Sequence, residues 1–243
     1  MARRNFEIAV AGAGPAGLTA ALAFRRYVPS ARIAVFDSAA ENPKSSIRAY
    51  AISAGSRNML LRIGVWKRLQ QPQTITSMDI TDSRLEDYVR QSFLQFGHSD
   101  PATSALGWIV EHDDLIAALY AEAGMKSIDL RAASVQGISS TDGYASLTTG
   151  DGDSFTSSLI VASDGANSRV RDLLHIPVTS WSYSRTAIVA TVQAELEHQG
   201  KAVQHFLPAG TFALLPLTGS RFSVVWVETV SYTHLRAHET RED

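Results

Sequence analysis

The sequence contains no cysteine among its 243 residues. This absence excludes disulfide bonds, thiolate metal sites and the class of flavin reductases that work through a redox-active cysteine pair. Long apolar runs are also missing, since no stretch approaches the roughly 18 residues that a membrane-spanning helix needs. The apolar segment Phe6–Ala11 has the length of a strand and is not a secretion signal. We therefore expect a cytoplasmic protein.

The sequence also lacks an excess of positive or negative charge, because it has 22 basic and 24 acidic residues and a formal net charge of −2. A nucleic-acid-binding surface needs clustered basic residues to face the phosphates, so we do not expect nucleic-acid binding. Apolar residues make up 45% of the chain and charged residues 19%. This composition is typical of a folded protein of one or two domains.

The first informative pattern lies at the amino-terminal end. An apolar run over Phe6–Gly12 is followed at once by a helix-forming stretch, Ala16–Arg26, and then by a second apolar run, Arg32–Asp37. A strand, helix and strand within about 30 residues form a βαβ unit, which implies a parallel sheet. The pattern predicts a doubly wound, Rossmann-like α/β fold.

Three glycines at the first strand-to-helix junction, Gly12, Gly14 and Gly17, form a GxGxxG pattern. Gly12 permits a tight turn, Gly14 lets the backbone approach a pyrophosphate, and Gly17 lets the helix pack close to the strand. Asp37 follows Gly17 by twenty residues and ends the second strand, where a carboxylate accepts from ribose hydroxyls and repels a 2′-phosphate. The pattern predicts dinucleotide binding, with an ordinary strand-to-helix turn as the alternative. It does not distinguish NAD from FAD.

A second strand-to-helix junction begins with the apolar stretch Ser158–Ala162. Asp164 and Gly165 make a sharp turn after it, at the strand end where ligands of open α/β sheets lie. Ser168 is placed to cap the helix that follows. An Asp-Gly pair is also one of the commonest turns in proteins, so an ordinary turn is the alternative.

Several stretches carry a resemblance to a known family. Besides the glycine pattern, the matching stretches are Arg48–Arg57 leading into Leu61–Trp66, Leu106–Glu111, Ser163–Arg171, Thr186–Glu195, His198, Gln204–Pro208 and Ala213–Leu217. They resemble the FAD-dependent aromatic hydroxylases of ubiquinone biosynthesis, within the p-hydroxybenzoate-hydroxylase-like flavoprotein monooxygenase superfamily. The resemblance covers residues 6 to about 228.

The resemblance implies FAD as cofactor and NADPH or NADH as reductant. Gly12, Gly14, Gly17 and Asp37 would hold the ADP half of FAD, Arg48 would reach toward the flavin side, and Asp164 would serve both FAD and the nicotinamide nucleotide. A solvated loop charge is the alternative for Arg48. At His112, many relatives outside this branch carry an arginine that contacts FAD, so we expect a helix-start surface histidine there.

The implied reaction is hydroxylation of the aromatic ring of a polyprenylated phenol by O2. We identify no catalytic residue and expect no metal site. A prenylated substrate suggests transient association with the inner membrane face or with a biosynthetic complex. The alternatives are a prenyl reductase or halogenase of the same fold, an NAD-dependent dehydrogenase, and a nucleotide-binding fragment without activity. The halogenase pattern WxWxIP is absent from the sequence.

The positions of these stretches predict two interleaved domains. We expect an FAD-binding domain over residues 1–72 and 98–177, and part of a β-rich substrate domain over 73–97 and 178–230. Phe212 and Trp226 are expected to pack in its core, with an aromatic substrate pocket as the alternative. Residues 231–243 resemble a translated vector tail, which makes His234 and His238 an accidental pair. Because the family carries a second Gly-Asp motif farther along, we expect a C-terminally truncated chain that retains FAD weakly or not at all.

Overall fold

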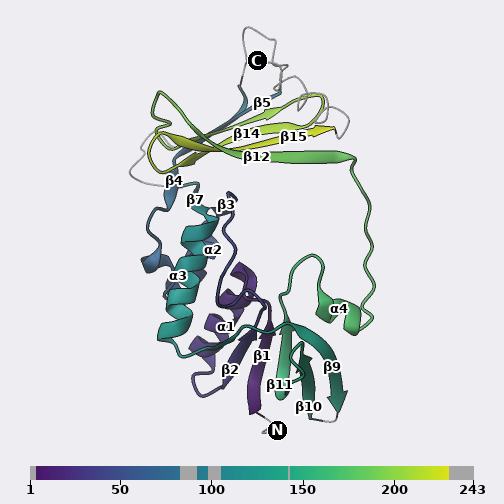
Figure 1. Cartoon of the computed structure of the whole chain (residues 1–243). Helices are drawn as coiled ribbons and strands as arrows, with labels where there is room; N and C mark the ends of the chain where they lie inside the picture. Colours follow the sequence, from purple (N-terminus) through teal and green to yellow (C-terminus); the bar gives the residue numbers. More distant parts are fainter. Residues whose placement is uncertain (1–3, 83–91, 98–104, 142, 230–243) are drawn as a thin grey trace. The chain divides into compact units, whose positions relative to one another are not determined.

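The computed structural model describes residues 4–82, 92–97, 105–141 and 143–229 (Figure 1). The chain divides into two compact units, and each is described by itself. The first unit comprises residues 1–45, 58–69 and 113–179, and the second comprises residues 46–57, 70–112 and 180–243. Residues 231–243, with His234 and His238, lie outside the described residues, so the interpretation of this segment as a tail stays a prediction.

A six-stranded sheet forms the centre of the first unit. Its strand order is β8 (Asp129–Arg131), β2 (Ile33–Phe36), β1 (Arg4–Ala11), β11 (Ser154–Ala162), β10 (Tyr144–Thr149) and β9 (Val135–Thr141). The first four strands are parallel to one another, whereas β10 pairs antiparallel with both β11 and β9. The βαβ unit and parallel sheet expected from the sequence are therefore confirmed.

The register brings three strand ends to one edge of this sheet. Ala11, the last residue of β1, pairs with Phe36 of β2 on one side and with Ala162 of β11 on the other. Because the three strands are parallel, the loops that follow them emerge together. Gly12, Asp37 and Asp164 lie in those loops.

The described residues form four α-helices and one 3-10 turn. They are α1 (Pro15–Tyr27), α2 (Ala54–Arg62), the 3-10 turn η1 (Trp66–Arg68), α3 (His112–Met125) and α4 (Arg169–Leu173). Helix α1 packs against β1 and β2, and α4 packs against β9. Proline at the first position of α1 suits a helix start, because its missing N–H would have no partner there. None of the described helices is both long and apolar enough to cross a bilayer.

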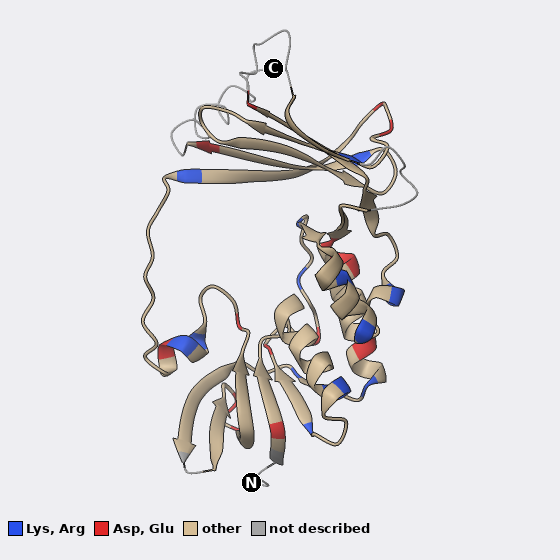
Figure 2. Ribbon diagram, turned by 180° about the vertical axis from the view of Figure 1, so that it is seen from behind, with Lys and Arg blue, Asp and Glu red and all other residues tan. Residues whose placement is uncertain are grey.

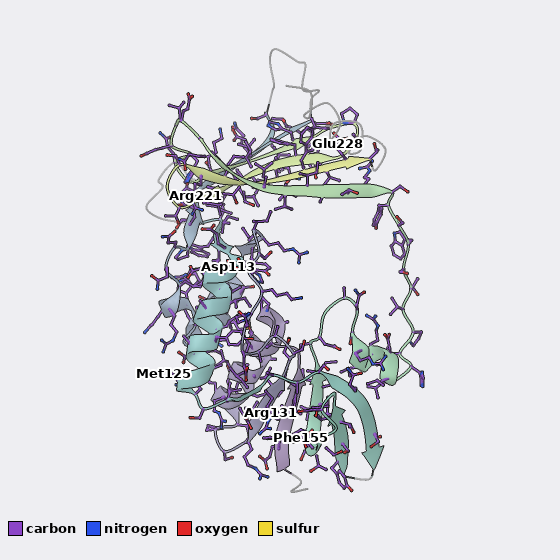
Figure 3. The ribbon with its side chains drawn as sticks, in the orientation of Figure 1. Asp113, Met125, Arg131, Phe155, Arg221 and Glu228 are labelled. Atoms are coloured by element: carbon purple, nitrogen blue, oxygen red, sulfur yellow. The ribbon has the colours of Figure 1, made fainter. Side chains whose placement is uncertain are left out.

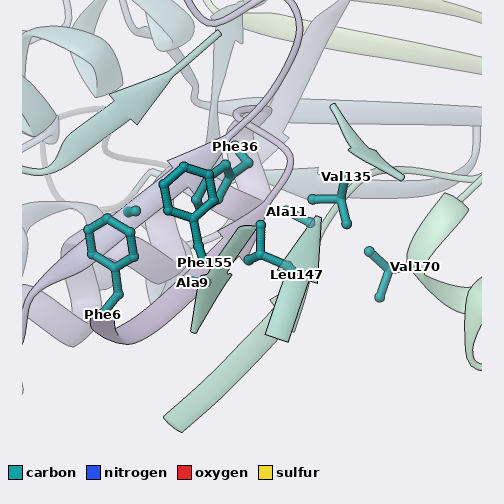
Figure 4. Packing of buried hydrophobic residues seen from close by; sticks show 9 residues of the cluster. Phe6, Ala9, Ala11, Phe36, Val135, Leu147, Phe155 and Val170 are labelled. Atoms are coloured by element: carbon teal, nitrogen blue, oxygen red, sulfur yellow. The ribbon is translucent and has the colours of Figure 1, made fainter. Parts of the chain in front are cut away.

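The core of the first unit contains a cluster of aromatic rings on one face of the sheet (Figure 4). The ring centroids of Phe36 and Phe155 lie 5.3 Å apart, and Phe6 lies 6.3 Å and 6.1 Å from them. The guanidinium of Arg131 lies over the Phe155 ring at 5.0 Å, and Figure 3 labels both residues. Such contacts add about 0.5–1.5 kcal/mol each to the burial of the rings, which fixes the strands that carry the edge loops.

The second unit is built from two sheets. The larger has the order β12 (Arg185–Gln193), β15 (Arg221–Thr229), β14 (Thr211–Leu217), β13 (Lys201–Phe206), β5 (Ser77–Asp82) and β6 (Ser92–Gly97). The smaller has the order β3 (Ala49–Ile52), β7 (Gly107–Glu111) and β4 (Gln73–Ile75). Ile75 and Ile109 of the small sheet form a buried cluster with Ala202 and Leu217 of the large one. The β-rich character expected for these segments is confirmed.

The boundaries of the two units differ from those of the expected domains, chiefly over two segments. The sequence patterns predict residues 46–57 and 105–112 as parts of the FAD-binding domain, whereas the structure groups them with the second unit. The reason is strand pairing, since β3 pairs with β7 over its whole length and β7 also pairs with β4. The assignment of the units as cofactor and substrate domains stays a prediction.

Candidate functional site

A pocket of about 360 Å³ lies at the edge of the first unit's sheet where β1, β2 and β11 end. The loops after these three strands and the start of β9 supply its walls. The lining residues are Ala11, Gly12, Gly14, Phe36, Asp37, Ser38, Ser134, Val135, Ser163, Asp164, Gly165, Asn167 and Arg169. A pocket of this size suits a small ligand or one half of a dinucleotide.

The glycines of the first loop separate into two kinds. Gly12 has a φ of +100°, and a Cβ there would lie 2.3 Å from the carbonyl oxygen of Ser163. A Cβ on Gly17 would lie 1.9 Å from the carbonyl oxygen of Gly12. No atom of the described residues lies within 4 Å of a Cβ built on Gly14. Gly12 and Gly17 are thus required by packing, while Gly14 leaves open space at the pocket wall for a group that approaches the backbone.

Asp37 connects the end of β2 to the glycine loop. Its Oδ2 accepts a hydrogen bond of 2.8 Å from the backbone N–H of Ala13, and its Oδ1 accepts one of 2.8 Å from Ala39. Each carboxylate oxygen can accept more than one hydrogen bond, so both remain able to accept from a ribose hydroxyl. Burial raises the pKa of Tyr120, and the charge of Asp37 raises that pKa further. The two hydrogen bonds from Ala13 and Ala39 thus fix the half-buried carboxylate of Asp37 in place.

Asp164 is held inside its own loop. Its Oδ1 accepts from the Ser168 hydroxyl at 2.5 Å, and its Oδ2 accepts from the backbone N–H of Val170 at 3.0 Å. Burial acts to raise the pKa of Asp164, but the bonds from Ser168 and the backbone outweigh it and hold the pKa below its ordinary value. Ser168 in turn accepts from the N–H of Arg171 at 3.1 Å, which confirms the expected helix cap. Both carboxylate oxygens thus stabilise the turn.

Arg48 belongs to the second unit, directly before β3, and its side chain is exposed. Its backbone carbonyl accepts from the N–H of His112 at 2.9 Å. The predicted contact of Arg48 with the flavin side of the cofactor stays a prediction. His112 is the first residue of α3, as expected, but it is half-buried and its Nδ1 lies 2.8 Å from the Tyr50 hydroxyl. It therefore has a structural partner in addition to its surface position.

Phe212 and Trp226 lie on the paired strands β14 and β15. Their ring centroids are 5.9 Å apart in an edge-to-face arrangement, and both side chains are half-buried. The indole N–H of Trp226 donates to Glu228 at 3.1 Å. These contacts support packing as their role.

Among the residues that line the pocket, the sequence patterns predict Gly12, Gly14, Asp37 and Asp164 as cofactor contacts and leave the others unassigned. Ser38, Ser134 and Val135 belong to no recognisable sequence pattern. Ser134 and Val135 reach the pocket only because β9 joins the sheet at its far side. Asn167 and Arg169 lie within the Asp-Gly turn that the sequence did single out. Their position in the sequence, shortly after Asp164, is the feature from which they could have been predicted as pocket residues. No group of three metal-ligating side chains occurs in the described part of the chain.

Comparison with known proteins adds independent information. A family model described as "FAD binding domain" matches residues 5–243. The ubiquinone hydroxylase UbiL of Rhodospirillum rubrum is 33% identical over 230 residues, which covers 91% of this chain and 52% of that protein. The mitochondrial ubiquinone biosynthesis monooxygenase COQ6 of Drosophila melanogaster is 30% identical over 243 residues, covering 93% and 50%. The chain spans about half the length of these curated relatives.

Solved structures share the fold. The crystal structure of the p-nitrophenol 4-monooxygenase PnpA from Pseudomonas putida superposes with a TM-score of 0.77 at 17% sequence identity. The match covers 96% of this chain and 61% of that one. At this identity the likeness concerns the arrangement of the backbone, and it agrees with an α/β unit combined with β-rich sheets.

Proposed function

Because the chain belongs to the FAD-binding domain family, we propose that its first unit binds the ADP half of FAD in the pocket beside Gly12, Asp37 and Asp164. The complete enzyme is proposed to be an FAD- and NAD(P)H-dependent monooxygenase that hydroxylates the aromatic ring of a polyprenylated phenol in ubiquinone biosynthesis. The similarity to UbiL and COQ6 supports this choice over a prenyl reductase, a halogenase or a dehydrogenase.

One observation carries the proposal. The hydrogen bond from the Ala13 N–H to Asp37 joins the loop that would face the diphosphate to the carboxylate that would face the ribose. The first turn of α1 has N–H groups without partners inside the helix, and its dipole favours an anion by about 0.3–1 kcal/mol. The open side of Gly14 lets the diphosphate approach the backbone. Gly12, Gly14, Gly17 and Asp37 would together hold the ADP half.

Bound FAD would supply the redox chemistry, accepting electrons from NADPH or NADH and passing them to O2. The residues of this chain would bind and orient the cofactor. Arg48 would approach the flavin side as a charge-assisted donor, and the Asp164 turn would serve the cofactor and the reductant. No residue is proposed as a general acid or base. A polyprenylated substrate implies transient contact of this cytoplasmic enzyme with the inner membrane face or with a biosynthetic complex.

The test is a titration of the purified chain with FAD, followed by flavin fluorescence. We expect saturable binding that ADP competes away, with little flavin carried through purification. NADPH oxidation stimulated by a prenylated phenol would support the monooxygenase assignment for this chain. ADP binding without such oxidation would favour a nucleotide-binding module. A folded chain that binds neither FAD nor ADP would contradict the proposal.

A further inference from the structure

The charges in the pocket are poorly matched to a diphosphate at first sight. Two of the lining side chains, Asp37 and Asp164, are carboxylates, and a diphosphate brings further negative charge. Among the described residues that line the pocket, Arg169 is the only cation. Any favourable side-chain charge from this unit's pocket wall must therefore come from Arg169.

The loop presents Arg169 outward between two anchored neighbours. Ser168 and Val170 are buried, with 7% and 2% of their surfaces exposed, and each donates a hydrogen bond to the Asp164 carboxylate. Arg169, between them, is exposed. The carboxylate of Asp164 is thus used to fix the backbone on both sides of the arginine. The arginine itself stays available to a ligand.

The second arginine of α4 provides a contrast. The guanidinium of Arg171 donates to the carbonyl oxygen of Ala166 at 2.8 Å and lies 3.7 Å from the Asp172 carboxylate. For the side chain of Arg169, the described part of the chain offers no hydrogen bond or ion pair. Figure 2 shows both signs of charge on this short helix. Arg171 stabilises the loop, whereas the guanidinium N–H groups of Arg169 have no partner among the described residues and are available to a ligand.

We propose that Arg169 binds the diphosphate of the dinucleotide through charge-assisted hydrogen bonds and that Asp164 acts by holding the loop that presents it. This inference rests on the proposed function, because it concerns the same pocket. A guanidinium suits the role, since it donates two parallel hydrogen bonds to phosphate oxygens. Arg169 also offsets part of the negative charge of the two carboxylates, Asp37 and Asp164, that would otherwise repel the ligand.

The experiment compares ADP with adenosine, which lacks phosphate, by calorimetry on the whole 243-residue chain. For Arg169→Gln we expect the Kd for ADP to rise about 10- to 100-fold while the Kd for adenosine is unchanged. Arg169→Lys should recover part of the loss. The control is Arg26→Gln, which removes the same charge from an exposed position of the same unit outside this pocket.

Two results would overturn the inference while leaving the proposed function intact. One is an Arg169→Gln variant that binds ADP as the wild type does. The other is an equal loss of ADP and adenosine affinity, which would indicate a change of the loop and not of a phosphate contact. If the folded wild-type chain binds no ADP at all, the proposed function itself fails. Circular dichroism of each variant confirms the fold.

Discussion

The carboxylate of Asp37 accepts a 2.8 Å hydrogen bond from the backbone N–H of Ala13, the residue between the first two glycines of the loop. The end of β2 and the start of α1 are therefore tied together by one side chain. A second bond, from the N–H of Ala39, fixes the other carboxylate oxygen. The proposed ribose and diphosphate sites would therefore be held at a fixed separation before a ligand binds, which would lower the entropic cost of binding.

Replacing Asp37 by alanine should weaken both the fold and the affinity for adenosine. The backbone N–H groups of Ala13 and Ala39 lose their acceptor, which should lower the free energy of unfolding by about 1–3 kcal/mol. Urea denaturation measures this loss, and calorimetry with adenosine measures the affinity. Asp151→Ala, in an exposed turn, should change neither quantity. Unchanged adenosine affinity in a folded Asp37→Ala variant would remove Asp37 from the ribose site.

Alanine at Gly14 should mainly reduce ADP affinity, whereas alanine at Gly17 should mainly reduce stability. At Gly14 the backbone is extended, and no described atom lies within 4 Å of the new Cβ. The free energy of unfolding should therefore change by less than about 1 kcal/mol. ADP affinity should nevertheless fall, because the methyl group takes the open space. At Gly17 the new Cβ meets the Gly12 carbonyl at 1.9 Å, and we expect a loss of about 1–3 kcal/mol in stability.

Gly124→Ala is the matched control for both variants. A Cβ there also meets no described atom within 4 Å, and the residue lies in α3. Alanine in a helix is favoured over glycine by about 0.5–1 kcal/mol, so thermal stability should rise slightly and ADP affinity should stay constant. Equal ADP affinities for wild type and Gly14→Ala would mean that the diphosphate does not approach this wall.

The bond between Ser168 and Asp164 should make part of the stability depend on pH. The folded state holds the pKa of Asp164 below its ordinary value, so its contribution is fully present above the ordinary carboxyl pKa of about 3.9. It is lost as the pH falls through the lower folded-state pKa. Ser168→Ala removes a bond that lowers this pKa and also the helix cap, at a cost of about 0.5–2 kcal/mol near neutral pH.

Thermal melts of wild type and Ser168→Ala across the acid range measure this difference. The gap between their melting temperatures should narrow as the solution becomes more acidic. Ser158→Ala, at an exposed position of β11, serves as the control and should follow the wild type throughout. A gap that is constant with pH would show that Ser168 stabilises the loop without acting through the Asp164 carboxylate.

Glu122 should contribute more to the stability of the first unit than its neighbour Lys126. Its side chain is 7% exposed and its Oε2 lies 2.5 Å from Nε of Arg68. Glu122→Ala leaves that guanidinium without its partner and should cost about 2–3 kcal/mol of unfolding free energy. Lys126→Ala should cost less than about 0.5 kcal/mol, because the lysine is half exposed and 3.8 Å away. Similar losses for the two variants would contradict this ranking.

The sequence predicts the part of the site that depends on local pattern. Gly12, Gly14, Gly17 and Asp37 follow from strand, loop and helix within one βαβ unit, and the cap by Ser168 follows from its place before α4. The alternation of apolar residues along the second unit indicated strands. Each of these features is decided within one βαβ unit or one short run of sequence, which is why it could be inferred.

The remaining features depend on pairing between distant strands. Ser134 and Val135 reach the pocket because β9 joins the far edge of the sheet, and Tyr50 meets His112 because β3 pairs with β7. The two hydrogen bonds of the Asp164 carboxylate are local contacts, but the sequence leaves them open because it equally allows that carboxylate to face a ligand. Long-range register is not encoded in any short window of sequence.

We propose that the diphosphate of an adenine dinucleotide lies against the start of α1, with its adenosine ribose against Asp37. A crystal structure of the chain grown with ADP tests it most directly. We expect phosphate oxygens within about 3 Å of backbone N–H groups in the first turn of α1, and a ribose hydroxyl at a similar distance from the Asp37 carboxylate. ADP bound at another site, with this loop free of phosphate, would contradict it.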